Sequence, residues 1–239
     1  MESRASSRLP QPTKPMSEKP KTKRSPFIGI WLFLAIILGG SLIGGGNSIY
    51  KAVSRQRHVI AEKETVNNAL QIGRAIHKFE SRYGSFPGKQ TGFEFDKSYV
   101  HKVSVSGNSS NALFRQLIAP DIAPENIFYA HIPKTQKPDN VVRKGHALEK
   151  GEVGFAYIAG LSSKDDPSTP LALTPLIPGT TKFDPKPFDG RAIILHIDNS
   201  VRAYEIHENG HSYRDGINLL SPKHPIWKGK APDIRYPDL

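Results

Sequence analysis

Residues 207–211 have the spacing of a zinc-protease motif, because His207, Glu208 and His211 match the pattern HExxH. In zinc proteases both histidines project from one face of a helix and the glutamate acts as a general base. Here the preceding residues, VRAYEI, alternate as in a β-strand, and Asn209-Gly210 is a strong turn dipeptide. We therefore predict a turn at 207–211, and a turn does not hold the two histidines as a preorganised pair of ligands.

The usual further zinc ligand is also missing. No glutamate follows Glu208, and Arg214 and Ile217 stand where the longer HExxHxxGxxH pattern has glycine and histidine, so only an aspartate such as Asp215 is left. The chain has no GxSxG motif, no phosphate-binding glycine loop and no dinucleotide fingerprint. We predict a protein without catalysis, metal or cofactor. One alternative stays open, an anchored extracytoplasmic zinc metallohydrolase that uses the two histidines and the glutamate of the motif.

Four aspartates offer oxygen ligands of the kind that calcium prefers: Asp165, Asp166, Asp184 and Asp189. Their spacing does not match an EF-hand loop, so we interpret them as residues of solvated loops.

The composition excludes several classes of function. The chain has 239 residues, no cysteine and a formal net charge of +11. Without cysteine there are no disulfides, no thiolate zinc sites and no thiol catalysis. Residues 1–26 hold seven Lys/Arg and two Glu, so nearly half of the excess positive charge lies there. The rest is not clustered in a basic motif, and we do not expect nucleic-acid binding.

Residues 27–46 are twenty residues without a charge. As a helix they span about 30 Å, the thickness of a bilayer's hydrocarbon core, and Trp31 and Tyr50 suit its two interfaces. We predict a single-pass transmembrane anchor. Gly40 and Gly44 form a GxxxG pair that lets two membrane helices approach closely, so a homo-oligomer is one expected state. Cleavage before Asn47, as in a signal peptide, remains an alternative.

Residues 1–26 are rich in serine, proline and lysine, and this composition predicts a disordered basic tail. The basic cluster of Lys19, Lys21, Lys23 and Arg24 directly precedes the apolar stretch. By the positive-inside rule the tail is cytoplasmic and the domain after residue 46 is periplasmic or otherwise extracytoplasmic. The expected location is the inner membrane.

Residues 47–83 predict an amphipathic helical stalk. Apolar residues recur at spacings of three, four or seven, and Gly84 and Pro87 end the pattern. We expect this stripe to be the core element of the following domain, packed on a sheet. Its members are Val59, Val66, Ala69, Ile72, Ile76, Phe79 and Tyr83.

Residues 84–220 predict an α+β domain with an antiparallel sheet, and residues 221–239, with four prolines, an extended wrap or loose tail. Residues 108–110 cap a short helix that contains Leu113, Phe114, Leu117 and Ile118. Strands are expected at 127–132 and 153–159, and a strand or irregular edge at 93–105. Pro170 and Pro175 limit residues 171–177 to an edge strand or an extended segment.

Residues 191–206 predict the clearest hairpin, RAIILHI and VRAYEI around Asp198-Asn199-Ser200. A two-residue loop, at either possible position, places Ile193 and Leu195 on the same side as Tyr204. We expect these three residues to pack against the helical stripe.

Two segments resemble the type IV pilin and type II secretion pseudopilin family. AEKETVNNALQIGRAIHKFESRYGSFP (residues 61–87) is similar to the end of the pilin N-terminal helix with its Tyr-Gly-x-x-Pro turn. AIILHIDNSVRAYEI (residues 192–206) is similar to the late strand pair of such domains. The resemblance implies a structural or interaction role in a secretion or pilus-like assembly, with the membrane and other envelope or pilin-like proteins as partners.

The chain departs from this family in its leader. It has Ser25-Pro26-Phe27-Ile28 in place of the family's cleavage site, and no glutamate between Phe27 and Glu62. Leader processing and glutamate-guided filament assembly are therefore not expected, and Gly44-Gly45-Gly46 could interrupt the helix. A third hypothesis is an anchored domain that binds a wall or surface ligand.

Overall fold

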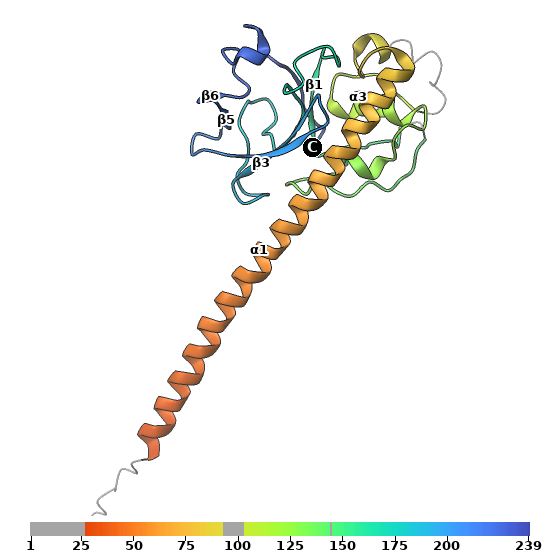
Figure 1. Cartoon of the computed structure of the whole chain (residues 1–239). Coiled ribbons are helices and arrows are strands. Elements are labelled where there is room, and N and C mark those ends of the chain that lie inside the picture. Colours follow the sequence, from red (N-terminus) through yellow and green to blue (C-terminus); the bar gives the residue numbers. More distant parts are fainter. Residues whose placement is uncertain (1–26, 93–102, 144) are drawn as a thin grey trace, which may run out of the picture. The chain divides into compact units, whose positions relative to one another are not determined.

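The computed structural model describes residues 27–92, 103–143 and 145–239, with side chains from Val53 onward (Figure 1). The chain divides into two compact units, residues 1–50 and 51–239. The fold is α+β, with a long helix and an antiparallel sheet. Its elements are α1 (Phe27–Tyr83), α3 (Ser110–Ile118), η1 (Glu125–Phe128), β1 (Ala156–Ala159), β2 (Pro170–Thr174), β3 (Arg191–His196), β4 (Val201–Glu205), β5 (Tyr213–Arg214), β6 (Ile217–Asn218), η2 (Pro225–Trp227) and β7 (Asp233–Arg235).

Helix α1 includes the glycine run at 44–46 within its bounds and ends where the sequence predicts. Gly84 has a φ of 81°, and its N–H donates to the Glu80 carbonyl at 2.7 Å, which closes the last turn. Within the part of the chain described with its side chains, no helix combines the length and apolar character needed to cross a membrane. The anchor predicted at 27–46, with Gly40 and Gly44, lies outside that part.

The apolar stripe of α1 is the centre of the larger unit. Ile72, Ile76 and Phe79 are fully buried in one cluster with Ile193 and Leu195 of β3. Tyr83 packs against this cluster while half-buried. Burying one such side chain is worth about 1.5–3 kcal/mol, so these contacts are comparable with a domain's net stability. The expected stripe extended too far at its start, because Val59 is 39% exposed and burial begins at Ala61.

The five strands lie in the order β4-β3-β2-β1-β7, and every pair is antiparallel. The expected edge position of 171–177 is wrong, because β2 pairs with both β1 and β3. Pro170 is the first residue of β2, and Pro175 follows its last. At these ends a missing N–H does not break the ladder, so two prolines are compatible with a central strand.

The predicted facing of the hairpin is also wrong. Leu195 pairs with Val201 and Ala192 with Tyr204, so the loop consists of residues 197–199 and is one residue longer than expected. Asn199 adopts a positive φ of 61°, which a three-residue hairpin loop needs at this position. Because side chains alternate along a strand, the extra residue moves Tyr204 to the face of β3 opposite Ile193 and Leu195.

Both faces of β3 are therefore buried. On the face away from α1, a second apolar cluster joins residues of β1, β2 and β3 to the irregular C-terminal part of the chain, and Tyr204 packs at its edge. Trp227 of η2 belongs to this cluster, and its Nε1–H donates to the Leu219 carbonyl at 2.8 Å. The C-terminal residues are an ordered wrap, since β7 extends the sheet beside β1.

Helix α3 matches the prediction, with the Ser109 hydroxyl accepting a hydrogen bond from the Ala112 N–H at 3.4 Å. The strand expected at 127–132 is wrong. The chain forms η1 there, and the Phe128 and Tyr129 carbonyls accept from the Gly154 N–H and the Asn68 side chain instead of from a neighbouring strand. Of the strand expected at 153–159 only 156–159 forms. For 93–105, residues 93–102 lie outside the described residues and 103–105 form no strand.

Candidate functional site

The HExxH segment is a turn, as its sequence predicts. The His207 N–H donates to the His211 carbonyl at 2.9 Å, and the Gly210 N–H donates to the His207 carbonyl at 2.8 Å. The His207 ring packs edge-on against Tyr213, whereas His211 Nδ1 lies 3.2 Å from the Thr181 carbonyl. The two imidazoles thus have different partners and do not share a helical face.

Asp165 and Asp166 form hydrogen bonds within their own loop. Asp165 accepts hydrogen bonds from Ser162, and Asp166 accepts from Ser168, whose two bonds lower the pKa of Asp166. Among the residues that the structure describes, no group of three or more His, Cys, Asp or Glu is arranged to hold a metal ion.

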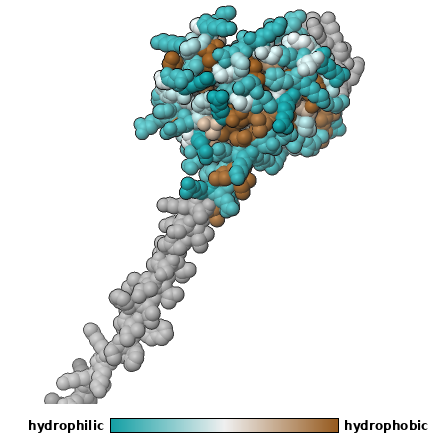
Figure 2. Space-filling view, viewed as in Figure 1, coloured by the Kyte–Doolittle hydropathy of each residue, from teal (hydrophilic) through white to brown (hydrophobic). Residues whose placement is uncertain are grey.

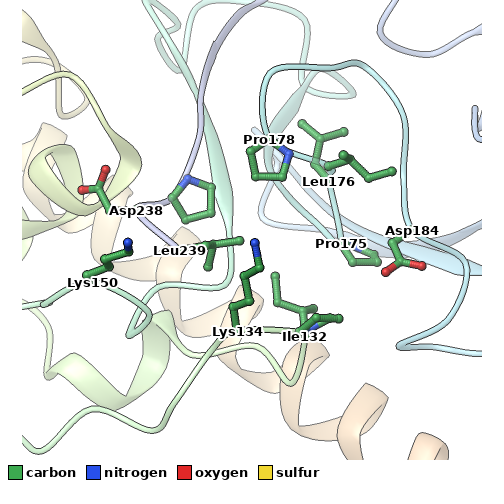
Figure 3. Close-up of a pocket in the computed structure, with 12 residues that line it drawn as sticks. Ile132, Lys134, Lys150, Pro175, Leu176, Pro178, Asp184, Asp238 and Leu239 are labelled. Atoms are coloured by element: carbon green, nitrogen blue, oxygen red, sulfur yellow. The ribbon is translucent and has the colours of Figure 1, made fainter.

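One hollow of the domain is a pocket of about 780 Å³, here called the larger pocket. It lies between three segments: the end of the chain, the loop after η1, and the loop after β2. Figure 3 shows Lys150 and Asp238 at one end, Pro175, Pro178 and Asp184 at the other, and Lys134 and Leu239 between them. Its lining residues are Ile132, Pro133, Lys134, Lys150, Pro175, Leu176, Ile177, Pro178, Asp184, Pro237, Asp238 and Leu239.

The walls of this pocket are mostly proline and aliphatic side chains. Figure 2 shows apolar residues gathered near the point where Figure 1 marks the end of the chain. Ile177 is 40% exposed, although it is held by a turn in which its N–H donates to the Lys182 carbonyl at 2.8 Å. A rigid apolar wall that stays open to water is typical of a binding surface.

Two lysines supply the positive charge of the larger pocket. Neither Lys134 nor Lys150 has a carboxylate partner among the described residues. Both lysines are exposed. Backbone hydrogen bonds fix the segments that carry them, because the Gln136 N–H donates to the Gly151 carbonyl and the Gly151 N–H donates to the Asp238 carbonyl. Gly151 has a φ of 87°, and a Cβ there would lie 3.0 Å from the Lys134 carbonyl, so the close approach requires glycine.

The two side-chain carboxylates of the larger pocket are already hydrogen-bonded. Asp238 Oδ2 accepts from the Ser109 hydroxyl at 2.7 Å, and Asp184 Oδ1 accepts from the Lys186 N–H at 3.0 Å. The lysine ammonium groups are therefore the polar groups most available to a ligand, and they favour a carboxylate beside an aliphatic group.

A second hollow of about 370 Å³, here called the basic pocket, shares Ile132 and Pro133 with the first. Its polar lining comes from α1 and from two loops packed on it, and no carboxylate is among the lining residues. Those polar residues are Ser54, Arg57, His58, His131 and Lys186.

Contacts on both sides fix the α1 wall of the basic pocket. His58 Nδ1 lies 2.9 Å from the Pro187 carbonyl, and Glu62 pairs with Arg191 at 2.7 Å, both toward the sheet. On the other side Glu64 pairs with Lys137 at 2.9 Å. The helix is thus held between the two loops that complete the pocket.

His196 and Glu125 are buried titratable groups that lie outside both pockets. Desolvation lowers the pKa of His196, whose ring contacts the Tyr204 hydroxyl at 3.1 Å and the Ser200 carbonyl at 3.3 Å. Burial raises the pKa of Glu125, which accepts from the Leu148 N–H at 2.8 Å. These contacts join segments of the fold, and we assign them to stability.

No family model, no curated protein and no solved structure matches the chain.

The sequence did not identify either pocket. Lys134 and Lys150 fall in a polar segment that has no periodic signal, and Lys186 lies in a proline-rich loop. Only the tertiary contacts of α1 and of the chain's last residues bring these lysines to a concave surface.

Proposed function

We propose that this chain is a single-pass, membrane-anchored envelope protein with a pilin-like layout, whose extracytoplasmic domain has a binding or structural role in an assembly. One observation carries the proposal. The helix that supplies the buried core of the domain, with Ile72, Ile76 and Phe79, has bounds that start at Phe27, inside the uncharged stretch. By its bounds, one helix therefore includes both the uncharged stretch and the core residues of the domain.

Further support comes from the sequence around that stretch. Residues 27–46 are uncharged, and the basic cluster precedes them, which favours a cytoplasmic tail and an outer domain. The long helix packed along an antiparallel sheet is the arrangement that the pilin resemblance implies. The role we propose is interaction and not catalysis.

The larger pocket is the surface we assign to the partner. Its fixed proline and aliphatic walls and its two unpaired lysines suit an extended protein segment with a carboxylate beside an aliphatic side chain. A volume of about 780 Å³ lies within the usual range of ligand pockets.

One experiment tests both halves of this proposal. A photoreactive residue replaces Ile177 in the full chain, alone or with Ile36→Arg, and the same cells are fractionated and irradiated. An arginine at the centre of a membrane helix costs about 3 kcal/mol, so the membrane-bound fraction should fall about tenfold or more. The anchored chain should cross-link at position 177 to an acidic, aliphatic segment of another protein chain, and the Ile36→Arg chain should not.

Two controls separate the outcomes. Ile36→Leu should leave fractionation unchanged, and a photoreactive residue at exposed Lys223, which lines neither pocket, should cross-link no such segment. A chain that stays soluble with or without the arginine contradicts the anchor. An anchored chain that cross-links equally from both positions contradicts the binding role of the pocket.

A further inference from the structure

The basic pocket differs from the larger pocket in its charge. Arg57 and Lys186 line it together with two histidines, and none of its lining residues is acidic. The carboxylates nearby are engaged elsewhere, since Glu62 pairs with Arg191 and Asp184 faces the larger pocket. Two cations in a concave site whose lining has no acidic residue favour a compact, multiply accepting anion such as a phosphate.

Two histidines and a serine add polar side chains to this site. His58 Nδ1 lies 2.9 Å from the Pro187 carbonyl, which can only accept, so Nδ1 carries the proton and Nε2 is the atom left for another partner. His131 is exposed, and its Nδ1 lies 2.8 Å from the Tyr129 hydroxyl. Ser54 supplies a hydroxyl from the next turn of α1.

Apolar side chains surround the same turns of α1. Among the described residues the exposed large hydrophobic side chains are Val53 (43%), Val59 (39%), Ile60 (60%) and Ile177. Three of the four therefore lie within two turns of Arg57. Exposed aliphatic groups beside basic ones are typical of a surface that contacts lipid headgroups and the adjoining acyl region.

Chain length keeps this pocket near the proposed anchor. Arg57 follows Gly46 by about eleven residues, so even a fully extended chain could not separate them by more than about 40 Å. We propose that the basic pocket binds the phosphate headgroup of an anionic phospholipid in the membrane that holds the anchor. This inference rests on the proposed function. The larger pocket is the poorer candidate because two carboxylates line it.

The test uses the full chain in nanodiscs of phosphatidylcholine, with or without phosphatidylglycerol, and measures the thermal unfolding midpoint of the domain. A headgroup that binds only the folded domain raises this midpoint, by an amount on the order of 3 °C. Arg57→Gln and Lys186→Gln should each abolish most of the difference between the two lipids.

Arg55→Gln is the matched control, because Arg55 is exposed on the same helix, loses the same charge and does not line the pocket. It should retain most of the lipid-dependent difference. Equal losses in the Arg55 and Arg57 variants would show diffuse attraction to the membrane and overturn the assignment.

A titration with soluble phosphate distinguishes binding of a lipid headgroup from binding of free phosphate. If inorganic phosphate at millimolar concentration stabilises the protein in phosphatidylcholine discs as much as phosphatidylglycerol does, the site binds free phosphate, and the lipid assignment is wrong. Failure of the chain to enter either kind of disc contradicts the anchor instead. Normal entry with no lipid-dependent difference contradicts only the pocket.

Discussion

The two faces of the sheet are buried in different ways. On one face α1 covers Ile193 and Leu195 with a regular apolar stripe, and α3 belongs to the same cluster. On the other, short pieces from the last part of the chain, including η2 and its Trp227, cover Ile194 and Leu173. The apolar residues of α1 repeat with a helical period, so they can be recognised in a sequence. The cover of the other face is irregular and is defined only by the contacts it makes.

The largest expected effect of a single substitution is on the helix face. Phe79 is fully buried there, and its ring lies 4.7 Å from that of Tyr83. Phe79→Ala should lower the free energy of unfolding by about 3–5 kcal/mol, because it removes apolar burial and leaves a cavity. Chemical denaturation of the full chain in detergent measures this.

Val59→Ala is its control on the same helix, since Val59 is 39% exposed and should change stability by less than about 0.5 kcal/mol. A Phe79→Ala protein as stable as the Val59→Ala protein would mean that the sheet is stable without the helix, and the contrast between the faces would disappear.

A smaller loss is expected on the opposite face. Trp227→Phe keeps most of the apolar volume but removes the hydrogen bond from Nε1–H to the Leu219 carbonyl, a buried acceptor. The free energy of unfolding should fall by about 1–3 kcal/mol. Tyr236→Phe removes a similar donor, to the Thr180 carbonyl, at a half-buried position, so its effect should be smaller. Equal losses of unfolding free energy in the two variants would show that the depth of burial does not determine how much each hydrogen bond stabilises this face.

What the sequence could predict follows the same division. The helix, its end at Gly84 and its buried residues from Ala69 to Phe79 came from a regular period and a stop signal, both local properties. The capped helix α3 was predicted on the same basis. The facing of the hairpin depended on a single loop residue, and an error of one residue moved Tyr204 to the other face.

The pockets could not be predicted because they are made of non-local contacts. Lys134, Lys150 and Pro237 come together where the Gln136 N–H donates to the Gly151 carbonyl and the Gly151 N–H donates to the Asp238 carbonyl. No local pattern encodes these pairings. Likewise, nothing in PLALT shows that β2 is central, because a proline at each boundary suggests an edge until its neighbours are known.

The smallest predicted effect concerns the hairpin that joins the two faces. His196 is fully buried, and desolvation holds its pKa below the ordinary value of 6.5. Above pH 6.5 the folded and unfolded chains both carry a neutral His196, and its full contribution to stability is present. Below pH 6.5 the unfolded chain binds a proton that the folded chain does not, so stability falls as pH falls toward the depressed pKa. One such group changes the free energy of unfolding by at most about 1.4 kcal/mol per pH unit.

Burial also lowers the pKa of His224 and raises that of Glu125, so the difference between the unmodified and the substituted protein is the informative quantity. His196→Gln should unfold with a shallower loss of stability than the unmodified chain between pH 6.5 and 5, measured by urea denaturation at each pH. Parallel curves for the two proteins would show that His196 is protonated in the folded chain as readily as in the unfolded chain, and that this part of the far face is open to water.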